Sequence, residues 1–170
     1  MADETILRLL PPLRMAWAAT GTQAVVPISG ANARRVLYGA INVRTGHRAL
    51  HRGGSMRQGE CHVFLRALRR AYRGRRIWLL LDRHGSHAAA GSARLAADLG
   101  IELLFLPRQC PELNPMDHLW KEVKRTVSAN RQFADIDAHA RAAEDWVRRL
   151  SPRQALRKAG ILSKNFWLPT

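Results

Sequence analysis

The architecture follows from one short apolar run that ends in an acid, Ile77-Trp78-Leu79-Leu80-Leu81-Asp82. Five successive apolar residues are typical of a buried strand. An alanine-rich segment, expected to be helical over about 87–99, follows it, and Gly100 is suited to end that helix. A second buried strand is predicted over 101–106. Polar residues just past the carboxyl ends of such strands often form the site of an α/β protein, and Asp82 stands at one of these positions.

Upstream of this run, the pattern predicts a hairpin. A strand is expected over 35–43, a turn over 44–47 and the partner strand over 48–51. An earlier strand is expected over 5–10, ended by two prolines, and a short one over 24–27. A hairpin continued by alternating helices and strands predicts a mixed α/β sheet with residues 77–81 at its centre.

Three longer helices are expected. In the first, Ser55 and Gln58 have capping-box spacing, and an apolar stripe follows at helical intervals: Cys61, Phe64, Leu65, Leu68 and Tyr72. The second is capped by Asn114 with Pro115 in its first position, and its core face carries Met116, Leu119, Trp120, Val123 and Val127. The third spans about 135–150. The tail, 151–170, is only weakly periodic.

The charge of the chain is its least ordinary property. The 170 residues carry a net charge of +15 with a pI of about 11.5, although the hydrophobic fraction of 46% is ordinary for one globular domain. All but four of the 28 basic residues are arginine, which suits bidentate recognition of phosphate. Because the charge is spread along the chain, it favours nucleic acid as a partner over a disordered basic tail. Biased composition remains the alternative reading.

Other classes find little support in the sequence. Cys61 and Cys110, the only cysteines, form neither a disulfide framework nor a metal-binding motif. The first residues do not resemble a signal peptide, and no apolar run approaches the length of a membrane span. We therefore expect a cytoplasmic, nucleoid-associated protein.

Three acids in this basic chain are candidate metal ligands: Asp3, Asp82 and Asp117. Mg²⁺ binds few protein carboxylates and leaves positions for phosphate oxygens, so such acids suit chemistry on a polyanion. Asp117 is expected in the first turn of its helix, where the macrodipole stabilises an anion. Taken singly, each acid is more often a turn, cap or terminal residue.

The residues around these acids resemble a known family. The segment Leu106-Pro107-x-x-x-Pro111-Glu112-Leu113-Asn114-Pro115-x-Asp117-His118-Leu119-Trp120-Lys121 resembles the third catalytic block of DDE transposases, in the bacterial insertion-sequence branch of the mariner-type superfamily. Leu81-Asp82-x-x-x-x-His87 is similar to the second block, and the 34 residues between the two acids (83–116) match the family spacing. Asp3-Glu4-Thr5, Trp17-x-x-x-Gly21, Tyr38-Gly39-Ala40 and Thr45-Gly46 resemble the first block.

The resemblance implies an RNase H-like mixed sheet flanked by helices, with a catalytic domain over 1–130 and a C-terminal helical extension over 131–170. It implies metal-dependent cleavage of double-stranded DNA at transposon ends and strand transfer into target DNA, by a homo-oligomer assembled on the DNA. Asp3, Asp82 and Asp117 would be catalytic and would hold Mg²⁺ or Mn²⁺, as two ions. His87 and Asn114 would support them, and the DNA-binding residues would be Arg83, Lys121, Lys124 and Arg125.

Several residues depart from the family pattern. Asp117 stands where the branch commonly has Glu, so Glu112 and Glu122 are rival third acids. Arg83 replaces a common Asn. Only two residues precede Asp3, which predicts a truncated first strand, a fraying terminus and weak activity of this chain alone. The helix-turn-helix that reads transposon ends is expected on a separate polypeptide, unless the chain is a decayed copy.

Two other functions stay open at this stage. One is a related RNase H-like nuclease or resolvase that shares the metal site but does not join strands. The other is a non-catalytic fragment that binds DNA without cutting it.

Overall fold

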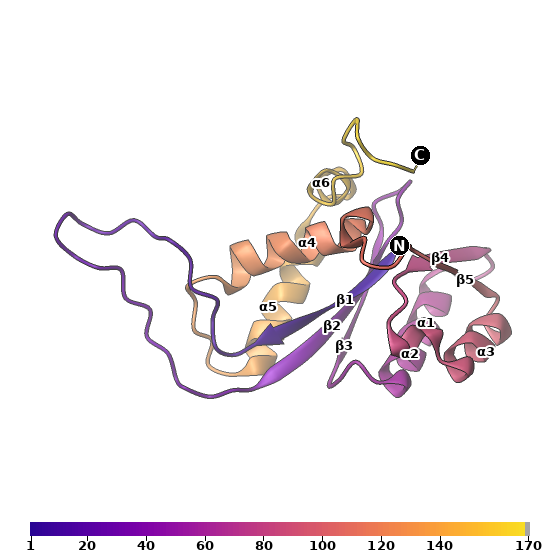
Figure 1. The fold of residues 1–170 in the computed structure, drawn as a ribbon, viewed down its shortest axis with the longest axis horizontal. Helices are drawn as coiled ribbons and strands as arrows, with labels where there is room; N and C mark the ends of the chain where they lie inside the picture. The colour runs from indigo at the N-terminus through magenta and orange to yellow at the C-terminus, as the bar shows by residue number, and fades with distance from the viewer. Residues whose placement is uncertain (169–170) are drawn as a thin grey trace.

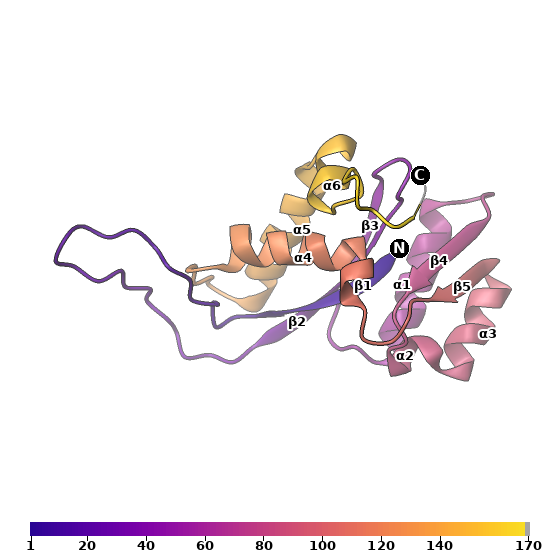
Figure 2. The same cartoon turned by 45° about the horizontal axis from the view of Figure 1, so that its top comes forward.

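The strands lie in the middle of the molecule, between two groups of helices. The computed structural model describes residues 1–168. Helices α1, α2 and α3 lie on one side of the strands, and α4, α5 and α6 on the other (Figures 1 and 2). In chain order the elements are β1 (Ala2–Arg8), β2 (Arg34–Ile41), β3 (Arg48–Gly53), α1 (Gln58–Ala71), β4 (Ile77–Leu81), α2 (Gly85–Ala88), α3 (Ala90–Asp98), β5 (Ile101–Phe105), η1 (Pro111–Leu113), α4 (Pro115–Val123), η2 (Lys124–Ser128), α5 (Ile136–Arg149) and α6 (Pro152–Lys158). The mixed α/β class is therefore confirmed. None of the helices in residues 1–168 combines the length and the apolarity that a membrane crossing requires.

The strands form two ladders. In the first, β1 pairs antiparallel with β2, and β2 pairs antiparallel with β3. In the second, β4 pairs parallel with β5, and β4 contacts β1 across the seam between the ladders. The middle of this arrangement is β1, so the expectation that residues 77–81 lie at the centre is wrong. The first ladder is three strands wide and the second only two, which gives the middle position to the strand that carries Asp3.

Two apolar cores lie on opposite faces of β1 and β2. Leu7, Leu37 and Ile41 pack with α4, α5 and α6. Val36 and Tyr38 point the other way and pack with α1, β4 and β5. Alternate residues of a strand point to opposite faces, so odd-numbered residues of β1 and β2 enter one core and even-numbered residues enter the other.

The first strand is longer at its beginning than expected. It starts at Ala2 rather than Thr5 and pairs with β2 along its whole length. Met1 is buried, and its amino group donates to the carbonyl of Ile41 at 2.9 Å. The expectation of a fraying terminus next to Asp3 is therefore wrong, because ladder hydrogen bonds and burial hold the strand in place. The start of this strand was not predicted from the sequence because Asp3 and Glu4 are charged.

An extended arm, residues 10–32, joins β1 to β2 and reaches away from the body of the molecule (Figure 1). At its base, Leu9 donates to Ala33 at 2.8 Å, and the Asn130 side chain bonds both backbone groups of Arg14 at 2.8 and 2.9 Å. The strand expected over 24–27 does not form, since no strand lies alongside to pair with it. Trp17 is fully exposed within the arm.

Three expectations about helix ends are wrong. The predicted capping box at Ser55 does not form, because α1 begins two residues later, with Arg57 as its cap and no side-chain cap bond. The carbonyl of Ser55 accepts from the Tyr38 hydroxyl at 2.8 Å. The helix expected over 87–99 is broken at Ala89, whose backbone is extended, into α2 and α3. The Met116 helix ends at Val123 and continues as a π-helical turn, although Val127 remains in the core.

The C-terminal helices share a core with α4. Helix α5 forms as expected, with Asp135 as its cap. Helix α6 lies within the helical extension expected over 131–170, although the weak periodicity of the tail did not locate it, and Ser151 and Gln154 form a capping box at its start. The Arg48 guanidinium on β3 donates to the carbonyls of Val147 and Arg148 at 3.2 Å and so fastens α5 to the sheet. The division at residue 130 stays a prediction.

Candidate active site

Three aspartates from distant parts of the chain line one cleft. Asp3 comes from the middle strand, Asp82 directly follows β4, and Asp117 lies in the first turn of α4. The loop that follows β5 closes the cleft with its residues 106–111. Parallel strands and helix starts bring their functional groups to one edge of a sheet, as the position of Asp82 predicted.

The charges in the cleft act most strongly on Asp3. Burial raises the pKa of the Asp3 carboxyl, and the negative charges of Glu4, Asp82 and Asp117 raise it further, to about 7. A carboxyl buried among other carboxylates is disfavoured in its charged form unless a cation joins it. The electrostatics of the cleft thus favour the binding of a cation.

Gly39 allows α4 to approach the strand that carries Asp3. It is the cross-strand partner of Asp3, and a Cβ at this position would lie only 2.6 Å from the Met116 and Trp120 side chains. Any larger residue would push α4, and Asp117 with it, away from β1. The closeness of two of the three acids depends on this glycine.

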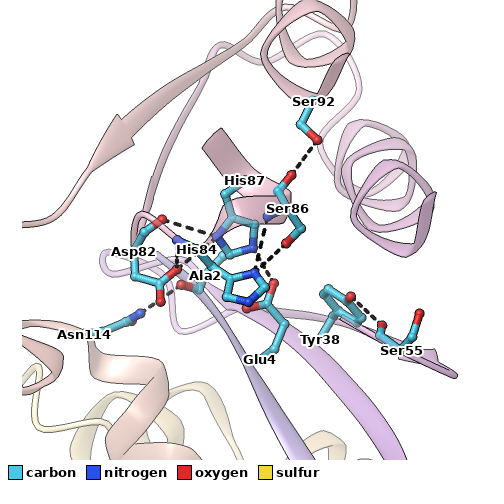
Figure 3. A network of polar contacts seen from close by, with 10 residues as sticks. All are labelled: Ala2, Glu4, Tyr38, Ser55, Asp82, His84, Ser86, His87, Ser92 and Asn114. Carbon is cyan, nitrogen blue, oxygen red and sulfur yellow. Dashed lines mark hydrogen bonds and ion pairs between the residues drawn. The ribbon is translucent and has the colours of Figure 1, made fainter. Parts of the chain in front are cut away.

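Asn114 ties the start of α4 to β1. Its Nδ2 donates to the carbonyl of Ala2 at 2.9 Å (Figure 3). Its Oδ1 accepts from the amide of Met116 at 3.2 Å. The side chain is buried and caps the helix as the sequence predicted. Asn114 therefore fixes the position of Asp117 relative to Asp3, and this is how it could support the site.

Asp117 is paired but not hydrogen-bonded. The Lys121 ammonium lies 2.7 Å from Oδ2 as an ion pair one helical turn away, in a geometry that does not make a hydrogen bond. Lys121 is mostly exposed, so this pair contributes little to stability. Oδ2 retains its capacity to bind a cation.

Within residues 1–168, Asp82 uses only one of its carboxylate oxygens for hydrogen bonds. Oδ1 accepts from the amide of His84 at 3.1 Å and from His87 Nδ1 at 3.0 Å (Figure 3). Within residues 1–168, no hydrogen bond reaches Oδ2. The hydrogen bond from His87 lowers the pKa of the Asp82 carboxyl, against the opposing effect of burial. Asp82 is therefore ionised at neutral pH.

Behind Asp82, His87 is buried between two carboxylates. Its Nε2 lies 2.6 Å from Glu4 Oε1, and both side chains are almost inaccessible to solvent (Figure 3). Burial alone would lower the pKa of His87, but hydrogen bonds to Asp82 and Glu4 outweigh it and raise that pKa to about 10. Glu4 was not a candidate at the sequence level. Its place next to Asp3, on the other face of an alternating strand, was the available signal.

The two rival acids lie elsewhere. Neither Glu112 nor Glu122 is among the described residues that line the cleft. Glu122 is held by Arg125 at 2.9 Å and by Lys158 of α6 at 2.9 Å, and these hydrogen bonds lower its pKa to about 2. Glu122 therefore fastens α4 to α6.

The predicted DNA-binding residues fall into different surroundings. Arg83 lines the cleft, with its guanidinium 5.1 Å from the centre of the Phe105 ring. Lys124 is exposed, whereas Arg125 is engaged by Glu122. Arg108 also lines the cleft and was not predicted. Arg69 of α1 donates to the carbonyls of Leu99 and Arg75, so it is partly structural. The DNA-binding assignments stay predictions.

A sequence comparison decides the family. The sequence model described as DDE superfamily endonuclease matches residues 1–139. The chain belongs to the DDE superfamily endonuclease family. An insertion element IS630 39 kDa protein of Shigella sonnei is 24% identical over 152 residues, which are 88% of this chain and 44% of that protein. The Tcb1 transposase of Caenorhabditis briggsae is 31% identical over 80 residues, which are 44% of this chain and 29% of that protein. The chain thus spans less than half the length of these relatives.

Solved structures confirm the fold of this DDE superfamily member. The Mos1 transposase in a paired-end complex with the left transposon end superposes with a TM-score of 0.72, at 18% identity, over 97% of this chain and 52% of that one. The catalytic domain of the Mos1 mariner transposase gives 0.65 at 17% identity, over 93% and 73%. The expected RNase H-like fold is therefore confirmed.

Proposed function

We propose that this chain is the catalytic domain of a DNA transposase, which cleaves transposon ends and transfers the cut strand to target DNA with two Mg²⁺ or Mn²⁺ ions. The observation that carries the proposal is the convergence of Asp3, Asp82 and Asp117 on one cleft. Related structures include Mos1 complexes with Mn and with Mg, which supports divalent metal use here.

The residues of the cleft fit a divalent cation. Carboxylate oxygens are the ligands that Mg²⁺ and Mn²⁺ prefer. One of them, Asp117 Oδ2, is buried without a hydrogen bond, and Asp3 is crowded by like charges. Asp3, Asp82 and Asp117 would hold the ions. When bound, such ions supply a Lewis acid for the phosphate and activate the attacking hydroxyl.

The residues of the chain supply position and charge. Asn114 and Gly39 hold α4 against β1, so that Asp117 stays close to Asp3. Arg83 and Arg108 line the same cleft and place positive charge beside the path of a phosphate backbone. Together with the net charge of +15, they support double-stranded DNA as the substrate. DNA of both kinds, transposon end and target, would be held by an oligomer at the nucleoid.

The test is metal-dependent nicking and joining of labelled DNA by the chain, compared with Asp82→Asn and Asp117→Asn. Each change removes a charged ligand at nearly constant shape, so both variants should fold and lose cleavage. Glu122→Gln is the matched control, which should cut normally. Cutting that survives Asp82→Asn would refute the assignment of the triad. Cutting without joining to target DNA would indicate a nuclease, and metal-dependent binding without cutting a non-catalytic fragment.

A further inference from the structure

The pair formed by Glu4 and His87 has no part in the function proposed above. Both side chains are buried, at 4% and 3% exposed, on the face of β1 opposite to Asp3. Burying a carboxylate costs several kcal/mol unless a partner compensates, so a buried acid next to a candidate ligand requires an explanation. Within residues 1–168, the only hydrogen-bond or ion-pair partner of the Glu4 side chain is His87.

The contacts define how the imidazole ring is used. Nε2 faces Glu4 Oε1 at 2.6 Å, and Nδ1 faces Asp82 Oδ1 at 3.0 Å and the Asp82 carbonyl at 3.2 Å. Carboxylate and carbonyl oxygens accept hydrogen bonds, so Nε2 donates to Glu4 and Nδ1 donates to Asp82. The ring therefore acts as a doubly donating bridge from one carboxylate to the other.

Glu4, Asp82 and His87 could also be taken for a metal site, because their ligand atoms lie within 4.8 Å of one another. The direction of the ring argues against this. Its two nitrogens point to different carboxylates, so an ion bound to one nitrogen would leave the other carboxylate without its partner. Metal-ligating histidines instead direct one nitrogen to the ion and the other to a supporting group. The arrangement here is that of a support behind a ligand.

We propose that Glu4 is a positioning residue, which acts through His87 to fix Asp82 so that Oδ2 stays available to the cation. The inference rests on the proposed function, because it treats Asp82 as a metal ligand. Glu4 orients the ring, the ring occupies Asp82 Oδ1 together with the His84 amide, and one oxygen is left for the ion. Without Glu4 the ring is free to turn, and Asp82 loses its fixed orientation.

The experiment compares wild type, Glu4→Gln and Glu60→Gln in the 170-residue chain, with Asp82→Asn to identify the site. Glu60 is the matched control because it also pairs with a histidine, His51 at 3.1 Å, but within residues 1–168 no hydrogen bond joins that histidine to Asp3, Asp82 or Asp117. Mn²⁺ binding is measured by the electron paramagnetic resonance signal of the free ion. Loss of a group that supports a metal ligand typically weakens binding by about 10- to 100-fold. We expect a loss in that range for Glu4→Gln and affinity within about twofold of wild type for Glu60→Gln.

Nitrogen-15 spectra of histidine supply a readout that does not depend on activity. Wild type should show both ring protons of His87 protected from exchange, with and without Mg²⁺, and Glu4→Gln should lose the Nε2 proton. Loss of a ring proton on adding Mg²⁺ to wild type would place the ion on the ring and overturn the inference.

Unchanged Mn²⁺ affinity in folded Glu4→Gln would also overturn it, while leaving the proposed function intact. If Glu4→Gln fails to fold, Glu4→Asp keeps the charge but withdraws it from the ring, and the same loss is expected. Absence of any Asp82-dependent Mn²⁺ binding in wild type would instead overturn the proposed function, and this inference with it.

Discussion

Replacing Asp3 by Asn should stabilise the metal-free protein at alkaline pH. The folded state raises the pKa of Asp3 from 3.8 to about 7, mainly through burial and then through the neighbouring acids. A carboxyl whose pKa is raised on folding contributes fully to stability below its unfolded pKa, and the contribution is lost as the pH rises through its folded pKa. For Asp3 the loss falls between about pH 4 and pH 7. The change in the Asp3 pKa from 3.8 to about 7 corresponds to roughly 4 kcal/mol of unfolding free energy.

Asparagine has nearly the same shape and carries no charge at any pH. The difference in unfolding free energy between Asp3→Asn and wild type should therefore grow by roughly 4 kcal/mol from pH 4 to pH 8. Urea denaturation in the presence of a chelator measures it at each pH. Added Mg²⁺ should shrink the difference, because only wild type keeps all three carboxylates for the ion. A difference that stays constant with pH, or an Asp3→Asn chain that is less stable at pH 8, would refute the reasoning.

Two further predictions concern how α4 is held. Gly39→Ala should destabilise the protein by about 1–3 kcal/mol and weaken metal binding, because the added Cβ collides with Met116 and Trp120. Gly59→Ala should do neither, because its Cβ would meet open space. Equal melting temperatures of the two variants would contradict this prediction. Glu122→Gln should cost about 1–2 kcal/mol at pH 7, since the folded state lowers the pKa of Glu122 to about 2 through Arg125 and Lys158. The stability that the ionised Glu122 contributes is present above the ordinary pKa of a glutamate and disappears as the pH falls toward 2. If denaturation curves showed the same effect of Glu122→Gln at pH 3 and pH 7, the ion pairs of Glu122 with Arg125 and Lys158 would not stabilise the fold.

The sequence predicted those parts of the fold that local signals determine. A few adjacent residues are enough to predict strands β4 and β5 and the Asn114 cap of α4. All three are present in the structure. What failed depends on contacts between distant residues. The start of β1 is polar and becomes a strand only because β2 pairs with it, and the break at Ala89 has no local marker in the sequence.

The same distinction applies to the site. The positions of Asp82 and Asp117, at a strand end and a helix start, could be predicted, as could their approach to Asp3 through the resemblance. The hydrogen bond between Glu4 and His87 joins residues 83 positions apart, so no local sequence pattern predicts it. The role of Gly39 could not be predicted either, because it depends on Trp120 of α4 lying directly over this residue.

The middle strand has a consequence for how the chain tolerates changes in length. Asp3 and Glu4 are neighbours in sequence but serve opposite sides of β1, one in the cleft and the other behind Asp82. Inserting or deleting one residue within β1 would move every following side chain to the other side and exchange the contents of the two cores. The arm of residues 10–32 carries no such constraint, because it pairs with no strand in the part of the chain that the structure describes. Variation in length among relatives should therefore accumulate in the arm and be absent from the seven residues of β1.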